Sequence, residues 1–157
     1  MNIGITQRVI DNEDYPDRRD ALGHNWYSWI ENALPNATLI PIPNNNKQLY
    51  NFIKSVDLSA IILSGGNSWC DDAPERDIVE TDLLNWATKK KENIPILGVC
   101  RGFQVILKIL CPNIKLKNTK DSDETHVDRT HSISVDKGQF SIDLPPIDKV
   151  NSYHDWG

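Results

Sequence analysis

Cys100 lies between two glycines in a pattern that is typical of a catalytic nucleophile. The segment Gly98-Val99-Cys100-Arg101-Gly102 is a Gly-x-nucleophile-x-Gly motif with cysteine in place of serine. In this motif a strained turn between a strand and a helix exposes the nucleophile, and the glycines let the backbone pack closely around it. The positive end of the helix dipole, together with the Arg101 guanidinium, favours the reactive thiolate. The motif therefore predicts nucleophilic catalysis; the alternative is a buried structural cysteine at an ordinary turn.

A second segment, Ser64-Gly65-Gly66, follows a predicted strand and can supply backbone amides. Its alternative role is a permissive loop, which is a common use of glycine after a strand. Beside the cysteine motif we favour the functional role. An amide of Gly65 or Gly66, together with the amide of Arg101, would form an oxyanion hole for a tetrahedral intermediate.

The first 110 residues alternate between predicted strands and helices. The apolar patterns predict strands at 2–7, 38–42, 58–63 and 94–99. They predict helices over 17–34, around 49–56, from around 79 to about 91, and over 101–110. The prolines that flank the second strand favour an edge position, and the fourth strand reads as buried on both faces. This alternation predicts a three-layer, flavodoxin-like α/β fold, with a mostly parallel sheet covered by helices on both faces.

Three segments that carry polar side chains, glycines or the cysteine lie at the carboxyl ends of predicted strands: 6–8, 64–66 and 100–101. Ligands of open parallel sheets bind at the carboxyl ends of the strands, so these segments are predicted to form one site. After Cys111 the pattern changes to short strands at 114–117, 131–135, 140–144 and 150–153, some of them antiparallel. We therefore expect one domain over residues 1–157, with a C-terminal part that is short or antiparallel and incomplete.

Composition narrows the function classes. The net charge of −5 is spread along the chain, so no basic surface for nucleic acid is expected. No apolar run approaches the length that spans a membrane, and the N-terminus lacks a signal-peptide pattern. The three cysteines are odd in number and lack metal-ligand spacing, which favours the reducing cytoplasm and predicts no metal site.

A thiol nucleophile needs a base, and the sequence offers four histidines: His24, His126, His131 and His154. His154 follows the last predicted strand, at the edge of the sheet where the site is expected. It is therefore our best candidate for a histidine near Cys100. The alternative is a histidine in an ordinary turn.

These segments together resemble the class I glutamine amidotransferase superfamily, and within it the γ-glutamyl hydrolase branch. The most specific match is Ile-Pro-Ile-Leu-Gly-Val-Cys-Arg-Gly-Phe-Gln at 94–104. Further matches are Gly-Ile-Thr-Gln-Arg at 4–8, Ile-Leu-Ser-Gly-Gly-Asn at 62–67, Arg76-Asp77 with Glu80, and Val-Asn-Ser-Tyr-His at 150–154. The resemblance extends over nearly the whole chain.

The resemblance implies roles for residues of this sequence. Cys100 is the nucleophile, and Arg101 and Gly66 (or its neighbour at position 65) donate to the oxyanion. Gln104 lies one helical turn after the cysteine, near the γ-glutamyl group. His154 matches a histidine near the active site that is not normally the base.

Two further residues, Gly65 and Arg8, are expected to contact the substrate. No metal or organic cofactor is implied. The family takes its base and orienting acid from a His-x-Glu segment, which this sequence does not contain. We therefore expect a C-terminally truncated chain.

The implied reaction is cytoplasmic hydrolysis of a γ-glutamyl amide through a glutamyl thioester, with a small-molecule γ-glutamyl substrate. Small bacterial members with this opening segment include enzymes of surface-polysaccharide synthesis, one group of which removes a γ-glutamyl cap from a cytidine diphosphate amidate. Two alternatives stay open: a glutaminase unit that passes ammonia to a synthase partner, and an inactive domain that only binds. The sequence does not decide whether the chain forms a homo-oligomer.

Overall fold

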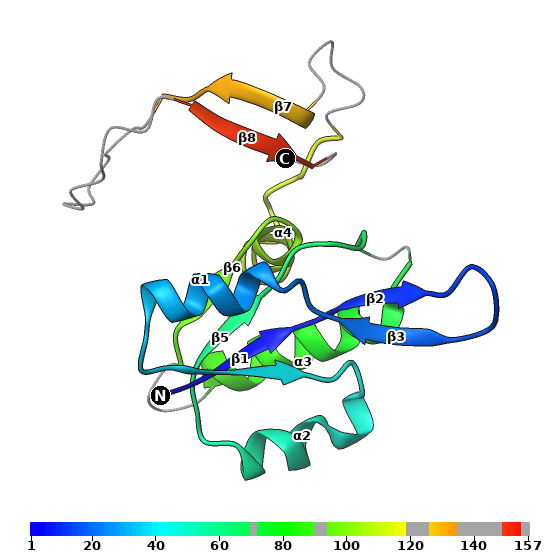
Figure 1. Cartoon of the computed structure of the whole chain (residues 1–157), viewed down its shortest axis with the longest axis vertical. Coiled ribbons are helices and arrows are strands. Elements are labelled where there is room, and N and C mark those ends of the chain that lie inside the picture. The colour runs from blue at the N-terminus through cyan, green and yellow to red at the C-terminus, as the bar shows by residue number, and fades with distance from the viewer. Residues whose placement is uncertain (70–71, 90–93, 119–125, 135–148, 155–157) are drawn as a thin grey trace. The chain divides into compact units, whose positions relative to one another are not determined.

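The computed structural model describes residues 1–69, 72–89, 94–118, 126–134 and 149–154 (Figure 1). The chain divides into two compact units, Met1–Ile114 and Lys115–Gly157, and each is described here by itself. The expectation of one domain over residues 1–157 stays a prediction. Within the described residues, no helix has the length and apolar character needed to cross a membrane.

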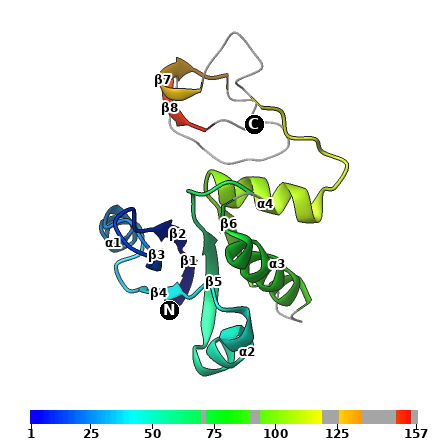
Figure 2. The same ribbon diagram turned by 90° about the vertical axis from the view of Figure 1, so that its right-hand side faces the viewer.

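The first unit is built on a four-stranded sheet in the order β4-β1-β5-β6, in which every neighbouring pair is parallel. Its strands are β1 (Asn2–Thr6), β4 (Thr38–Ile42), β5 (Leu58–Leu63) and β6 (Ile96–Gly98). Seen along the sheet, α1 lies on one side, and α2 and α3 lie on the other (Figure 2). This arrangement confirms the predicted flavodoxin-like α/β fold and the edge position of β4.

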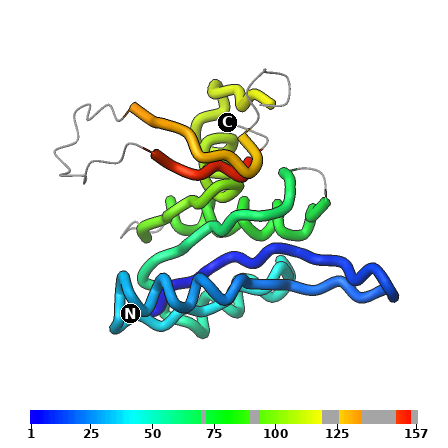
Figure 3. The backbone as a smooth tube through the Cα atoms, turned by 45° about the horizontal axis from the view of Figure 1, so that its top comes forward, coloured from blue at the N-terminus to red at the C-terminus, as the bar shows by residue number. Residues whose placement is uncertain are grey.

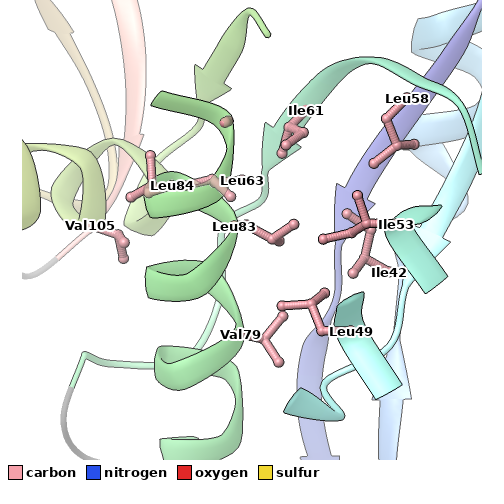
Figure 4. Close-up of a cluster of buried hydrophobic side chains, with 11 residues drawn as sticks. Ile42, Leu49, Ile53, Leu58, Ile61, Leu63, Val79, Leu83, Leu84 and Val105 are labelled. Atoms are coloured by element: carbon pink, nitrogen blue, oxygen red, sulfur yellow. The ribbon is translucent and has the colours of Figure 1, made fainter. Parts of the chain in front are cut away.

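Alternation along the strands separates two apolar clusters on the two faces of the sheet. Consecutive residues of a strand point to opposite faces, so Ile61 and Ile62 of β5 enter different clusters. Ile62 joins Ile30 of α1 on one face. Ile61 joins Leu83 of α3 and Val105 of α4 on the other face (Figure 4). These buried side chains fix the helices over the sheet by removing apolar surface from water.

In the described residues, four helices connect or follow the strands: α1 (Asn25–Ala33), α2 (Asn46–Ser55), α3 (Pro74–Lys89) and α4 (Arg101–Leu110). The prediction of a helix over 17–34 was wrong in its first half. Residues 18–21 form β3 (Arg18–Ala21), which pairs antiparallel with β2 (Arg8–Asp11) in a hairpin (Figure 3). The first three residues of β3 are charged and have no apolar face to bury, so the helix begins only where Trp26 and Ile30 reach the core.

The last strand of this sheet differs from its prediction. We expected residues 94–99 to be buried on both faces, but Leu97 is 45% exposed. The physical reason is that β6 is an edge strand of the described sheet and has β5 as its one neighbour. Its carboxyl end nevertheless leads directly into the turn at Cys100 and into α4.

In the second unit, β7 (Val127–Ser132) and β8 (Lys149–Tyr153) form an antiparallel pair. This pair confirms an antiparallel C-terminal part and the strand predicted at 150–153. Residues 114–117 are not a strand, contrary to prediction, and the strand predicted at 140–144 lies outside the described residues.

Candidate active site

The turn at Cys100 has the strained backbone that the sequence motif predicts. Cys100 has φ 54° and ψ −114° and is the residue immediately before α4. A non-glycine residue rarely adopts a positive φ, and such strain is concentrated at functional sites. The thiol is free and the residue is exposed. The backbone therefore holds this cysteine out from the sheet at the start of a helix.

The two flanking glycines are required because the backbone approaches too closely for any side chain. A Cβ added at Gly98 would lie 2.6 Å from the amide nitrogen of Phe103. A Cβ added at Gly102 would lie 2.0 Å from the carbonyl oxygen of Leu63. Both distances are far below van der Waals contact, so the glycines are what lets β5, β6 and α4 meet at this turn.

The segment after β5 lies against the cysteine. A Cβ added at Gly65 would lie 3.2 Å from Cβ and 3.8 Å from Sγ of Cys100. Gly66 has φ 81°, which favours glycine. Within the described residues, the amides of Gly65, Gly66 and Arg101 donate no hydrogen bond. These unpaired donors are what an oxyanion hole beside the thiol needs, although their catalytic role stays a prediction.

Arg76 of α3 binds the backbone of Ser64, Gly65 and Gly66, which we call the glycine segment. Its side chain is fully buried, and Nη1 donates to the carbonyl oxygens of Gly65 at 3.1 Å and Gly66 at 2.6 Å. Nη2 donates to the carbonyl oxygen of Ser64 at 2.7 Å and to its Oγ at 3.0 Å. With its carbonyl groups bound on the buried side, the segment has its backbone conformation fixed independently of any ligand.

Glu80 links this arginine to α4, the helix that begins after Cys100. We call the turn formed by residues 98–102 the elbow. The Glu80 carboxylate accepts from Arg76 Nε at 2.9 Å, from Thr6 Oγ1 at 2.7 Å and from Nη1 of Arg101. Arg101 also donates to Asp77, so two buried cations face two carboxylates. Burial is the main cause that lowers the pKa of Arg76, and Glu80 opposes it. We name these four residues, Arg76, Asp77, Glu80 and Arg101, the buried ion cluster.

The side chain of Arg101 does not lie where the prediction placed it, beside the thiol of Cys100. We expected its guanidinium to favour the Cys100 thiolate, but it points inward to Asp77 and Glu80 and is 2% exposed. Its guanidinium carbon also lies 5.6 Å from the centroid of the Trp69 ring. Two carboxylates neutralise its charge, so its side chain anchors α4, and only its backbone amide is available to a substrate.

The other predicted site residues fall in different places. Gln104 is half-buried one turn into α4, and its backbone N–H donates to the carbonyl oxygen of Cys100 at 3.2 Å. Arg8 is exposed beside Gly66. His154 belongs to the second unit, where its ring centroid lies 5.1 Å from that of His126. Its assignment to the active site stays a prediction.

A family model described as Peptidase C26 matches residues 2–157. The chain belongs to the Peptidase C26 family. It is 36% identical over 112 residues to a γ-glutamyl-CDP-amidate hydrolase of Campylobacter jejuni subsp. jejuni serotype O:2, covering 68% of this chain and 54% of the relative. The chain thus spans about half the length of this curated relative. The two matches confirm the resemblance that the sequence motifs predicted.

In this Peptidase C26 chain the glycine spacing predicts the turn at Cys100, but no pattern predicts the buried ion cluster. Arg76, Asp77 and Glu80 stand out in the sequence only through the family resemblance. The available signal was the spacing of Arg76 and Glu80, which places an ion pair on one face of a helix. That pattern is typical of an exposed helix surface, so it does not indicate that this pair is fully buried.

We predict that Gly102→Ala destabilises this Peptidase C26 fold by about 3 kcal/mol, because the new Cβ collides with the backbone at Leu63. Urea unfolding followed by circular dichroism measures the change. Gly23→Ala is the matched control, because its Cβ would meet only the side chain of Asn25, which can move. Equal stability of the two variants would contradict the close approach at the elbow.

We also predict that Arg76→Met lowers the free energy of unfolding by about 3–5 kcal/mol, because it leaves buried Glu80 with one cation fewer. The control is Arg18→Met, which breaks ion pairs of a partly exposed arginine and should cost about 1 kcal/mol or less. If both substitutions have similar effects on the urea midpoint, the buried ion cluster is not what holds this region together.

Proposed function

We propose that this chain uses Cys100 to hydrolyse a γ-glutamyl amide through a glutamyl thioester. The observation that carries the proposal is the strained, exposed Cys100 with Gly65 packed against it, next to three amides that lack partners in the described part of the chain. A nucleophile adjacent to preorganised donors is the arrangement that acyl transfer requires. Family membership and the hydrolase relative support the same chemistry.

In the proposed reaction the Cys100 thiolate attacks the γ-carbonyl carbon of the substrate. Negative charge moves to the carbonyl oxygen, where the amides of Arg101 and of Gly65 or Gly66 stabilise it. The C–N bond then breaks, the leaving nitrogen takes a proton, and a thioester remains. Water attacks the thioester, releases glutamate and restores the thiol. We propose His154 as a histidine near this chemistry.

The proposed substrate is a small γ-glutamyl compound. The name of the Campylobacter relative, γ-glutamyl-CDP-amidate hydrolase, supports a substrate in which a γ-glutamyl group is attached to the amidate nitrogen. A compound of that kind fits the synthesis of surface polysaccharides from cytoplasmic precursors. We therefore propose a cytoplasmic hydrolase that acts on such a precursor and needs no synthase partner for turnover.

We predict that Cys100→Ser lowers the rate of γ-glutamyl-4-nitroanilide hydrolysis at least about a thousandfold while the circular dichroism spectrum stays unchanged. Serine is nearly the same size but does not form the nucleophilic anion at neutral pH. Release of 4-nitroaniline and of glutamate measures the rate. The control is Cys111→Ser, which removes the other exposed free cysteine of the described residues and should keep full activity.

Three outcomes distinguish the proposal from its alternatives. Retained activity in Cys100→Ser would show that the nucleophile is wrongly assigned. Glutamate release from glutamine that rises only when a synthase partner is added would favour an ammonia-supplying glutaminase. A wild-type protein that releases no glutamate, and whose Cys100 resists glutamine-like electrophiles in a Cys70→Ser, Cys111→Ser background, would be a binding domain.

A further inference from the structure

Arg8 differs from the other arginines of the first unit in having no charged partner among the described residues. That unit contains five arginines. The other four form ion pairs with carboxylates: Arg18, Arg19, Arg76 and Arg101. Arg8 is exposed and forms neither an ion pair nor a hydrogen bond through its side chain with any described residue. Within the described part of this unit, the Arg8 guanidinium is therefore available to a ligand.

This available guanidinium lies beside the elbow. A Cβ added at Gly66 would be 3.4 Å from both Cβ and Nε of Arg8, so the arginine stem packs on the glycine segment. The preceding glycine, Gly65, is the residue that contacts Cys100. Arg8 and Cys100 thus lie against adjacent glycines of one short segment.

The backbone on both sides of Arg8 is fixed. The amide of Val9 donates to Asn67 Oδ1 at 2.7 Å, and Asn67 Nδ2 donates back to the Val9 carbonyl oxygen at 2.9 Å. On the other side, the Gln7 carbonyl oxygen accepts from Asn44 Nδ2 at 3.0 Å. These bonds hold the start of the β2–β3 hairpin against the glycine segment, so a ligand need not order this backbone.

The charge of Arg8 also acts at this site. Burial lowers the pKa of Arg76, and the positive charges of Arg101 and Arg8 lower it further. Arg8 is thus close enough for its field to reach the guanidinium that holds the glycine segment.

We propose that Arg8 is a specificity-determining residue that binds an anionic group of the substrate beside the bond that Cys100 attacks. A guanidinium binds carboxylate and phosphate through paired N–H donors. This inference rests on the proposed function and specifies its substrate class. The anion has two sources: the α-carboxylate of the γ-glutamyl group, or a phosphate of the leaving group.

The test compares two alkylating reagents, anionic iodoacetate and neutral iodoacetamide, on Cys100 in a Cys70→Ser, Cys111→Ser background. A change in the reactivity of the thiol itself affects both reagents, so the ratio of their rates isolates attraction of the anion. We expect Arg8→Gln to lower the iodoacetate-to-iodoacetamide ratio about two- to fivefold at low salt. No turnover is needed, so an inactive protein would refute the proposed function without affecting this result.

The control is Arg19→Gln, which also removes one positive charge. Arg19 lies on β3, the strand that pairs with β2, and it forms an ion pair with Asp17. It should leave the ratio nearly unchanged. An unchanged ratio in Arg8→Gln, or an equal decrease in both variants, would overturn the proposal.

A protection assay identifies the source of the anion. L-Glutamate that slows alkylation by iodoacetamide in the parent protein but not in Arg8→Gln assigns Arg8 to the α-carboxylate. Inorganic pyrophosphate with the same dependence assigns it to the leaving group. If neither compound protects in a way that depends on Arg8, the residue does not bind substrate anions and the proposal fails.

Discussion

The rest of the site depends on the carboxylate of Glu80. It accepts hydrogen bonds from Thr6 at the end of β1, from Arg76 in its own helix and from Arg101 at the start of α4. Arg76 in turn binds the carbonyl groups of the segment that contacts Cys100. One buried acid thus fixes three chain segments that lie far apart in the sequence, and it sets the thiol against the glycine amides.

Burying four charges is costly, and an apolar replacement of similar volume would often be as stable. The charged side chains contribute hydrogen bonds of fixed direction. An arginine such as Arg76 can bind three carbonyl groups and a carboxylate at once, which no apolar side chain can do. The turn at Cys100 stores backbone strain, and strain persists only where the surroundings over-determine it. The buried ion cluster and the close contacts of Gly102 supply that constraint.

Sequence patterns predicted the sheet and the elbow because both depend on local signals. Strand alternation fixed β1 and β5, and the glycine spacing fixed the turn at Cys100. The β2–β3 hairpin was missed because the apolar spacing that predicts the helix begins only at Leu22, and β3 precedes it. Arg18 of β3 forms an ion pair with Glu75, which lies far away in the sequence. The inward turn of Arg101 was missed for a similar reason: its partners lie more than twenty residues away. The catalytic roles of Cys100 and of the neighbouring amides stay predictions.

We propose that the turn at Cys100 makes this cysteine the residue that accepts the glutamyl group. The most direct test is acid quenching of the protein milliseconds after mixing with a γ-glutamyl anilide, followed by peptide mapping by mass spectrometry. We expect a glutamyl group on the peptide that contains Cys100, formed at the rate of anilide release and absent from Cys100→Ser. A glutamyl group on another residue, or anilide release without any acylated peptide, would show that Cys100 is not the nucleophile.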